Sequence, residues 1–244
     1  MAFATAPELQ PDGVVRRWPN RPNFEAENLL SSAIKENGDI AFFDDATAAA
    51  ISAHSFDGKG RWKTTLCISI GTGIGGGAII ADVPLTGRTG AAMDVGHMLV
   101  PSASGLPCSC GRCGCLQAAA SGFAFRKLLP SARSPDDIFQ EAGSGAAMTL
   151  ARATSAIIEA LAILGSLFDP ERVSIAGGLG LSQLFERIEI ELKNRQVGVS
   201  IERHKFGEDA GLLGAAIGFY RYRRNDYGAQ ASEDSRYQFD EGIT

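Results

Sequence analysis

The order of hydrophobic and polar positions along the chain predicts strands that alternate with helices. Short apolar runs, partly β-branched, predict strands over residues 40–43, 64–70, 77–82, 173–176 and 197–202. Apolar positions at helical spacing predict helices over residues 24–37, 46–53, 115–129, 148–168, 181–195 and 209–222. Such alternation is typical of a layered α/β fold.

Two segments follow neither the strand pattern nor the helix pattern. The glycine-rich residues 71–76 join the strands predicted at 64–70 and 77–82, which indicates a hairpin with an enlarged turn. Residues 93–114 are irregular, with Gly, Pro and Ser throughout. A loop of this length inside a compact domain requires a function or a staple.

Composition narrows the class of protein. The 244 residues suffice for one large domain or two small lobes, and the 45% hydrophobic and 21% charged shares are ordinary for a soluble globular protein. A net charge of −5 without a basic run argues against nucleic acid or an anionic membrane as a partner. No stretch approaches the roughly 20 apolar residues of a membrane span. The N-terminus lacks the basic start of a signal peptide, so we expect a cytoplasmic protein.

Four of the five cysteines lie within eight positions, which favours a metal site over disulfides in such a protein. His97 with Cys108, Cys110 and Cys115 supplies the ligands of a closed, structural zinc site. The remaining Cys113 could replace Cys110 or Cys115, or stay free. The alternative is a cluster of packed thiols without metal.

Two adjacent carboxylates, Asp44 and Asp45, follow a predicted strand and precede a predicted helix. A carboxylate beside a like charge has a raised pKa, which suits a general base directed at a hydroxyl. The alternative is that Asp45 only caps the helix. Asp94, three residues before His97, could hold substrate hydroxyls or be an ordinary loop acid.

Two glycine clusters are candidates for phosphate or nucleotide binding, because glycine lets backbone N–H groups approach phosphate oxygens. The first offers Gly71, Thr72, Gly73 and Gly75, and the second, Gly177-Gly178, follows a predicted strand. The first matches neither a Walker loop nor a dinucleotide fingerprint. Plain glycine turns are the alternative for both.

Read in order, these signals resemble the ROK family of sugar kinases and related repressors. The resemblance rests on FFDDATAAA, SIGTGIGGGAII, TGAAMDVGHMLV, CSCGRCGCLQAAASG, SIAGGLG and EDAGLLGAAIGF, and it covers about residues 11–222. The most discriminating part is the cysteine motif from Cys108 to Gln117.

The resemblance implies an actin-like, hexokinase-type ATPase fold that binds ATP with Mg2+ and a structural Zn2+. It implies that Asp45 is the catalytic base, that the loop at Gly71–Gly75 contacts phosphates, and that Gly177 and Gly178 lie on the adenosine side. His97 would ligate zinc and also reach the sugar. The other implied sugar contacts are Asn20, Asp44, Asp94 and Gln117. The family also implies a homodimer.

The chain departs from the family pattern at several positions. The family has Asn-Asp where this chain has Asp44-Asp45, and Glu where it has Asp94 and Gln117. The family's opening Asp-x-Gly-Gly-Thr is absent, so we expect a truncated N-terminal lobe. The expected division is a remnant of that lobe at 1–55, a C-terminal ATPase lobe with the zinc loop at 56–223, and a polar tail at 224–244.

The sequence therefore predicts ATP-dependent phosphorylation of a hexose or an N-acylhexosamine. Two alternatives stay open: a catalytically impaired sugar-binding or regulatory relative, and a zinc-stapled fragment that needs a partner lobe. A DNA-binding repressor is disfavoured, because no helix-turn-helix or basic region precedes the domain.

Overall fold

The structure is a computed structural model of the chain. It describes residues 2–5, 8–9, 14–17, 23, 26–28, 40–56, 63–88, 90–129, 134–140, 144–224, 226 and 237–238. Asn20 and most of the helix predicted at 24–37 lie outside the described residues.

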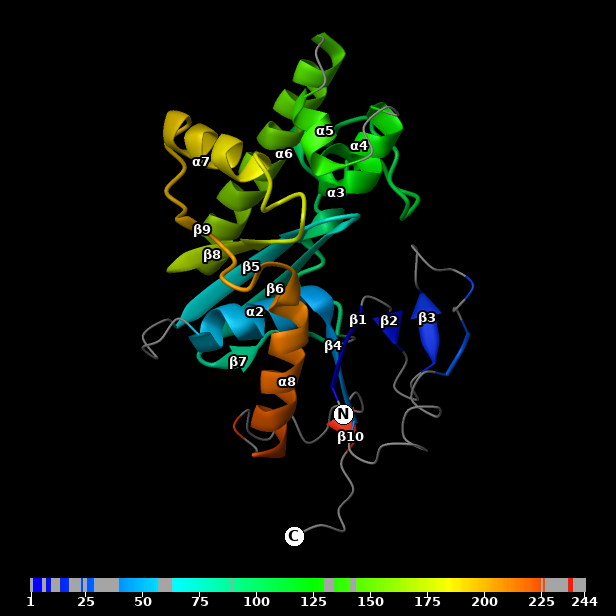
Figure 1. The fold of residues 1–244 in the computed structure, drawn as a ribbon, viewed down its shortest axis with the longest axis vertical. Helices are drawn as coiled ribbons and strands as arrows, with labels where there is room; N and C mark the ends of the chain where they lie inside the picture. Colours follow the sequence, from blue (N-terminus) through cyan, green and yellow to red (C-terminus); the bar gives the residue numbers. More distant parts are fainter. Residues whose placement is uncertain are drawn as a thin grey trace.

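A mixed five-stranded sheet forms the centre of the fold, in the order β7-β6-β5-β8-β9. Its strands are β5 (Thr64–Ile70), β6 (Ile74–Ile80), β7 (Val83–Pro84), β8 (Arg172–Ala176) and β9 (Ile201–Arg203). The hairpin β5–β6 is antiparallel, whereas β8 runs parallel to both β5 and β9. The sheet carries helices on both faces (Figure 1), which confirms the layered α/β architecture.

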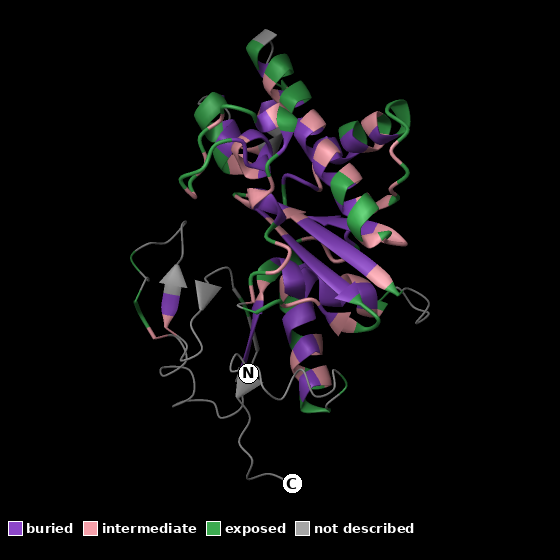
Figure 2. Ribbon diagram, turned by 180° about the vertical axis from the view of Figure 1, so that it is seen from behind, coloured by how far each residue is buried: buried purple, intermediate pink, exposed green. Residues whose placement is uncertain are grey.

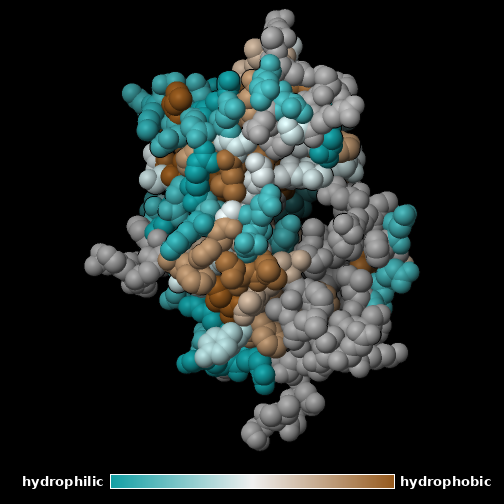
Figure 3. All heavy atoms as spheres, in the orientation of Figure 1, coloured by the Kyte–Doolittle hydropathy of each residue, from teal (hydrophilic) through white to brown (hydrophobic). Residues whose placement is uncertain are grey.

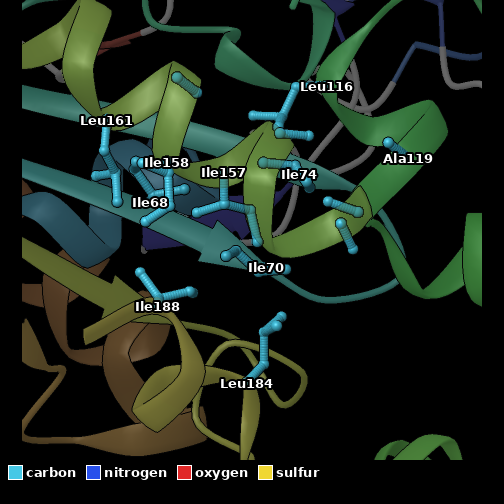
Figure 4. Close-up of a cluster of buried hydrophobic side chains, with 14 of the residues drawn as sticks. Ile68, Ile70, Ile74, Leu116, Ala119, Ile157, Ile158, Leu161, Leu184 and Ile188 are labelled. Carbon is cyan, nitrogen blue, oxygen red and sulfur yellow. The ribbon is translucent and has the colours of Figure 1, made fainter. Parts of the chain in front are cut away.

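The larger core lies between the sheet and the helices α3 (Leu116–Ala120), α6 (Ser144–Phe168) and α7 (Leu184–Asn194). Figure 4 shows isoleucines of β5 and β6 meeting Ile157, Ile158 and Leu161 of α6, with Leu184 and Ile188 of α7 beside them. The strands and the inner helix faces form a continuous buried layer in Figure 2. The short helices α4 (Gly122–Leu128) and α5 (Pro135–Gln140) follow α3 along the chain.

The opposite face of the sheet is covered by α2 (Asp45–Phe56) and α8 (Ala210–Arg223). These two helices pack closely, because small residues line their contact. A methyl group added at Gly214 would lie 1.6 Å from the Ala48 carbonyl oxygen, so only glycine fits there. Leu212 and Tyr220 of α8 are 67% and 60% exposed. Figure 3 shows hydrophobic surface in the part of the molecule where α8 lies in this orientation.

A smaller sheet leads into α2. Its central strand β4 (Ile40–Asp44) pairs in parallel with β1 (Ala2–Thr5) and antiparallel with β10 (Tyr237–Gln238). A separate ladder joins β2 (Glu8–Leu9) to β3 (Val15–Arg17). Because β4 ends where α2 begins, two adjacent acidic residues sit at the junction.

Three predicted elements require correction. The turn of the β5–β6 hairpin is not enlarged: only residues 71–73 form it, and the following glycines belong to β6. The helix predicted at 115–129 is broken at Ser121, whose hydroxyl accepts a hydrogen bond from the Ala124 N–H and caps α4. The strand predicted at 197–202 is reduced to β9, and the short 3-10 helix η4 (Gly207–Asp209) precedes α8.

One helix is more apolar than the sequence analysis indicated. Within Gly145–Phe168 of α6, a window of 18 residues has a mean hydropathy of 1.5, so this helix is long and apolar enough to cross a membrane. Half of this window is buried inside the protein, where α6 contributes to the larger core. Its composition is therefore explained by its place as a core helix, and a single such helix is weak evidence for a membrane protein.

Candidate functional site

Asp44 and Asp45 have different environments although they are adjacent. The Asp44 carboxylate accepts hydrogen bonds from the Thr47 N–H, at 2.9 Å, and the Thr47 hydroxyl, at 3.2 Å. Asp44 therefore caps α2, and the suggestion that Asp45 is the capping residue is wrong. Asp45 is exposed in the first helical turn. A methyl group placed on Gly75 would lie 3.9 Å from its Oδ1 atom, so this carboxylate faces the glycine-rich strand β6.

The Asp44 carboxyl group is unusually hard to ionise. Burial first, and the charge of Asp45 second, raise its pKa to about 7, although the hydrogen bonds from Thr47 oppose the shift. The pair therefore carries less than two full negative charges at neutral pH. The positive end of the α2 helix dipole lies beside this pair and favours the charge that remains. Sequence reasoning missed Thr47, although its position three residues after Asp44 matches a capping pattern.

The turn Gly71–Gly73 is fixed from two sides. The Gly71 N–H donates to the Gly73 carbonyl oxygen at 2.9 Å. At the start of α4, the Gly122 N–H donates to the Gly71 carbonyl oxygen at 2.8 Å, and the Phe123 N–H donates to that of Thr72 at 3.0 Å. A methyl group on Gly71 would meet nothing within 4 Å. The turn therefore has a defined shape and one open side.

The second glycine pair lies at the same end of the sheet. Gly177 follows β8 with a φ of 80°, which favours glycine, and a methyl group there would lie 2.5 Å from the Ile70 carbonyl oxygen. The Gly180 N–H donates to that same oxygen at 2.9 Å. Because Ile70 is the last residue of β5, this turn adjoins the turn that starts at Gly71. A methyl group on Gly178 would meet nothing within 4 Å, so this turn also has an open side.

The segment after β7 brings one imidazole and three thiols together. The ligand atoms of His97, Cys108, Cys110 and Cys115 all lie within 4.8 Å of one another. The Cys108 Sγ atom lies 3.5 Å from His97 Nδ1, and the Cys110 and Cys115 sulfurs lie 3.6 Å apart. Zinc bond lengths in a tetrahedron require S–N and S–S separations of about 3.5–3.8 Å. These two separations match those of zinc ligands, and the remaining donor pairs lie no more than 4.8 Å apart, so the four side chains could hold a zinc ion.

Cys113 lies apart from this cluster and is exposed. The two 3-10 helices η2 (Val95–His97) and η3 (Pro101–Ala103) and tight turns at Gly111 and Gly114, both with a φ of 87°, shape the loop. Backbone pairing of Leu99 with Cys115 and of Pro107 with Cys113 holds its two sides together. The fold of the loop therefore separates the four potential ligands from the extra cysteine.

Two polar side chains contact the thiols from outside. Arg112 Nε donates to Cys110 Sγ at 3.4 Å, and Gln117 Nε2 donates to Cys108 Sγ at 3.5 Å. Desolvation raises the pKa of Cys110, but hydrogen bonds, first those from Arg112, outweigh it and lower the pKa to about 6. Sequence reasoning did not identify Arg112, and its place between the cysteines is the only signal that could have done so.

The predicted sugar contacts are only partly brought together. Asp94 Oδ2 lies 3.8 Å from His97 Nε2, and its side chain is 54% exposed. The two ring nitrogens of His97 thus face different groups, with Nδ1 toward Cys108 and Nε2 toward Asp94. The Gln117 amide contacts Cys108 and the Ser109 hydroxyl.

Glycines of β6 connect the carboxylates to the thiol–imidazole cluster. A methyl group on Gly75 would lie 3.2 Å from Ala46 of α2, and one on Gly76 would lie 2.7 Å from the Met93 carbonyl oxygen. A methyl group on Gly96 would come within 2.1 Å of the Ile74 carbonyl oxygen. The carboxylate pair, the glycine turn and the cluster therefore share one region. Such a site offers carboxylates, a glycine turn with one open side and a loop whose four donors could hold a metal ion.

The chain is similar in sequence to known proteins over most of its length. Residues 11–221 match the model of the ROK family. A glucokinase of Thermotoga maritima is 30% identical over 84% of this chain and 74% of its own length. An N-acetylmannosamine kinase of Haemophilus influenzae (strain PittEE) is 30% identical over 78% of this chain and 67% of its own length.

Solved structures agree with this match. A ROK family glucokinase from Streptomyces griseus, in complex with glucose and AMPPNP, is 25% identical, with a TM-score of 0.72 over 88% of this chain and 80% of its own. The fold is thus the actin-like, hexokinase-type ATPase fold that the sequence predicted.

Proposed function

The chain belongs to the ROK family, and from that premise we propose that it is a sugar kinase. The proposed reaction transfers the γ-phosphoryl group of ATP to a hydroxyl of a hexose or an N-acylhexosamine. The observation that carries the proposal is the position of Asp45, whose carboxylate faces Gly75 of β6, two residues after the turn Gly71–Gly73. A base and a phosphate cradle are the two parts that this reaction requires from the protein.

In this proposal Asp45 accepts the proton of the sugar hydroxyl as its oxygen attacks the γ-phosphorus, and the bond to the leaving ADP oxygen breaks. The phosphates are assigned to Gly71, Thr72, Gly73 and Gly75. Because the Gly71 N–H already donates to the Gly73 carbonyl oxygen, the contacts would come from backbone N–H groups beyond Gly71 and from the threonine hydroxyl. Mg2+ supplies the positive charge that neutralises the phosphates. The adenosine side is assigned to Gly177 and Gly178.

The sugar is assigned to Asp44, Asp94, His97 and Gln117, with Asn20 as a further contact outside the described residues. We assign a structural zinc to His97, Cys108, Cys110 and Cys115, where it would fix the loop that carries Asp94 and His97 and leads into the helix that carries Gln117. The assignment is supported by the Cys108–His97 and Cys110–Cys115 separations of 3.5 and 3.6 Å and by the gathering of all four donor atoms within 4.8 Å. We further propose that the chain divides into parts at residues 55 and 223, that it forms a homodimer and that it is located in the cytoplasm.

The test is phosphorylation by the purified chain of glucose, mannose, fructose, N-acetylglucosamine and N-acetylmannosamine, measured as sugar-dependent release of ADP. We expect turnover on at least one sugar and a loss of at least about 100-fold in Asp45→Asn, in line with removal of a general base. Asp209→Asn, which removes an exposed carboxylate at the start of α8, is the control and should keep full activity.

Equal turnover by Asp45→Asn and the unchanged protein would refute the role of Asp45. Absence of turnover on every sugar, with the chain folded, would refute the kinase. One contact favours a second function in that event: the Gln117 amide is engaged by Cys108 and Ser109. A sugar-binding relative without turnover would then show saturable sugar binding by calorimetry, which Asp94→Ala should weaken.

A further inference from the structure

Gln117 lies between the thiol–imidazole cluster and the glycine turn. It is in the first turn of α3, directly after Cys115 and Leu116. Its amide nitrogen lies 3.5 Å from Cys108 Sγ and 3.2 Å from the Ser109 hydroxyl. Its amide oxygen lies on the other side, where methyl groups on Gly73 and Gly96 would come within 3.4 and 3.2 Å of it.

The amide nitrogen of Gln117 supplies the hydrogen-bond donor that a metal-bound Cys108 requires. A metal-bound cysteine is a thiolate, which accepts hydrogen bonds but cannot donate them. The amide N–H groups of Gln117 donate to Cys108 and Ser109, whereas a carboxylate at this position would offer no donor and would bring a like charge toward the sulfur. Glutamine is therefore the residue type that satisfies Cys108.

We propose that Gln117 is a positioning residue of the zinc site, which holds Cys108 through an N–H···S hydrogen bond and thereby couples the zinc site to the turn at Gly73. The inference rests on the proposed zinc site, and it assigns to Gln117 a role distinct from sugar binding. Outer-shell donors orient a ligand and disperse part of its negative charge, so their loss weakens metal binding even though no ligand is removed.

The coupling follows from the covalent and packing contacts of Gln117. Its carbonyl oxygen accepts the Ser121 N–H at 3.2 Å, and the next residue, Gly122, donates to Gly71. The side-chain oxygen of Gln117 faces Gly73 from the other direction, since a methyl group on Gly73 would lie 3.4 Å from it. A shift of Cys108 on loss of the metal is therefore transmitted to the turn through Gln117.

The first test compares the unchanged protein with Gln117→Leu, which keeps a similar volume without a donor. Gln183→Leu is the matched control, because Gln183 is exposed before α7 and its side chain makes no capping bond. Zinc affinity is measured by competition with a chromophoric chelator, which needs no sugar and no turnover. We expect zinc to bind Gln117→Leu about tenfold or more weakly, and the control within twofold of the unchanged protein.

Equal zinc affinity of Gln117→Leu and the unchanged protein would overturn the inference. Thermal unfolding separates hydrogen bonding from packing: the inference expects Gln117→Leu to lose stability mainly with zinc bound. An equal loss in the zinc-free state would assign the side chain to packing and would overturn it. Failure of the unchanged protein to bind one zinc ion would instead remove the zinc site itself, and this inference with it.

The second test measures hydrogen exchange of the amides at residues 71–76 before and after zinc is removed. Zinc removal should speed their exchange in the unchanged protein, and by a clearly smaller factor in Gln117→Leu. The same acceleration in both proteins would show that the zinc site and the turn are not coupled through Gln117.

Discussion

Asp44→Asn is expected to stabilise the protein more at pH 8 than at pH 5. The substitution keeps the size of the side chain, and its amide oxygen can still accept the Thr47 N–H that Asp44 now holds at 2.9 Å. Asn is as good a capping residue as Asp, so the cap itself should cost little. What changes is the charge that Asp44 must carry in a half-buried position beside Asp45.

The sign and size follow from the shift in pKa. The pKa of Asp44 is about 7 in the folded protein, against 3.8 for an ordinary aspartate. Between these values the folded state binds the proton more tightly than the unfolded chain, so stability falls as the pH rises and becomes level above about pH 7. Between pH 5 and pH 8 the free energy that the raised pKa of Asp44 costs the folded state grows by the equivalent of about two pKa units, which is about 3 kcal/mol at most. Because the carboxyl group keeps part of its hydration, we expect about 1–3 kcal/mol.

The assay is urea unfolding of both proteins at pH 5 and pH 8. The free energy of unfolding of Asp44→Asn, relative to the unchanged protein, should be higher at pH 8 than at pH 5 by the stated amount. Asp209→Asn carries the same change of charge at an exposed position and is the matched control. A relative stability of Asp44→Asn that is the same at both pH values, or lower at pH 8, would refute the reasoning.

Two further predictions concern packing and metal. Gly214→Ala should lower the free energy of unfolding by about 1–3 kcal/mol, because its methyl group would meet the Ala48 carbonyl oxygen at 1.6 Å and force α2 and α8 apart. The control is Gly145→Ala, in open space at the start of α6, which should be neutral or stabilising by up to about 1 kcal/mol in the same urea titration. An equal loss of stability in both variants would contradict this prediction. Removal of zinc by a chelator should lower the melting temperature of the unchanged protein but not that of Cys115→Ser, which lacks one ligand; a chelator effect of the same size in both would exclude Cys115 as a ligand.

Sequence patterns predicted those helices and strands that bury one regular face in the core. The strand at 40–43, the strand at 173–176 and the long helix at 148–168 each present a regular buried face, and all three are confirmed. The spacing of the cysteines likewise indicated which side chains gather, because a short loop brings its own ligands together. Local periodicity was sufficient in these cases.

Elsewhere the outcome depended on contacts between distant segments, which local patterns do not contain. The helix predicted at 115–129 breaks at Ser121, and the Gly122 N–H beyond the break donates to Gly71 instead of continuing a helix. The extra strand length of β6 arises from pairing of Gly75–Gly77 with β5, although glycine is disfavoured in strands. The orientation of Gln117 toward Cys108 also required the folded loop.

The glycines of β6 explain why the chain accepts this poor strand sequence at its site. Successive residues of a strand face opposite sides of the sheet. A methyl group on Gly75 or Gly77 would press on Ala46 of α2, while one on Gly76 would press on the Met93 carbonyl oxygen and on Val95. The strand is thus held between the helix that carries the carboxylates and the segment that carries His97, with backbone in contact on both faces. The thickness of β6 sets the distance between the Asp44–Asp45 carboxylates and the segment that carries His97. A side chain at any of these three positions would therefore move the two apart even where the fold survives.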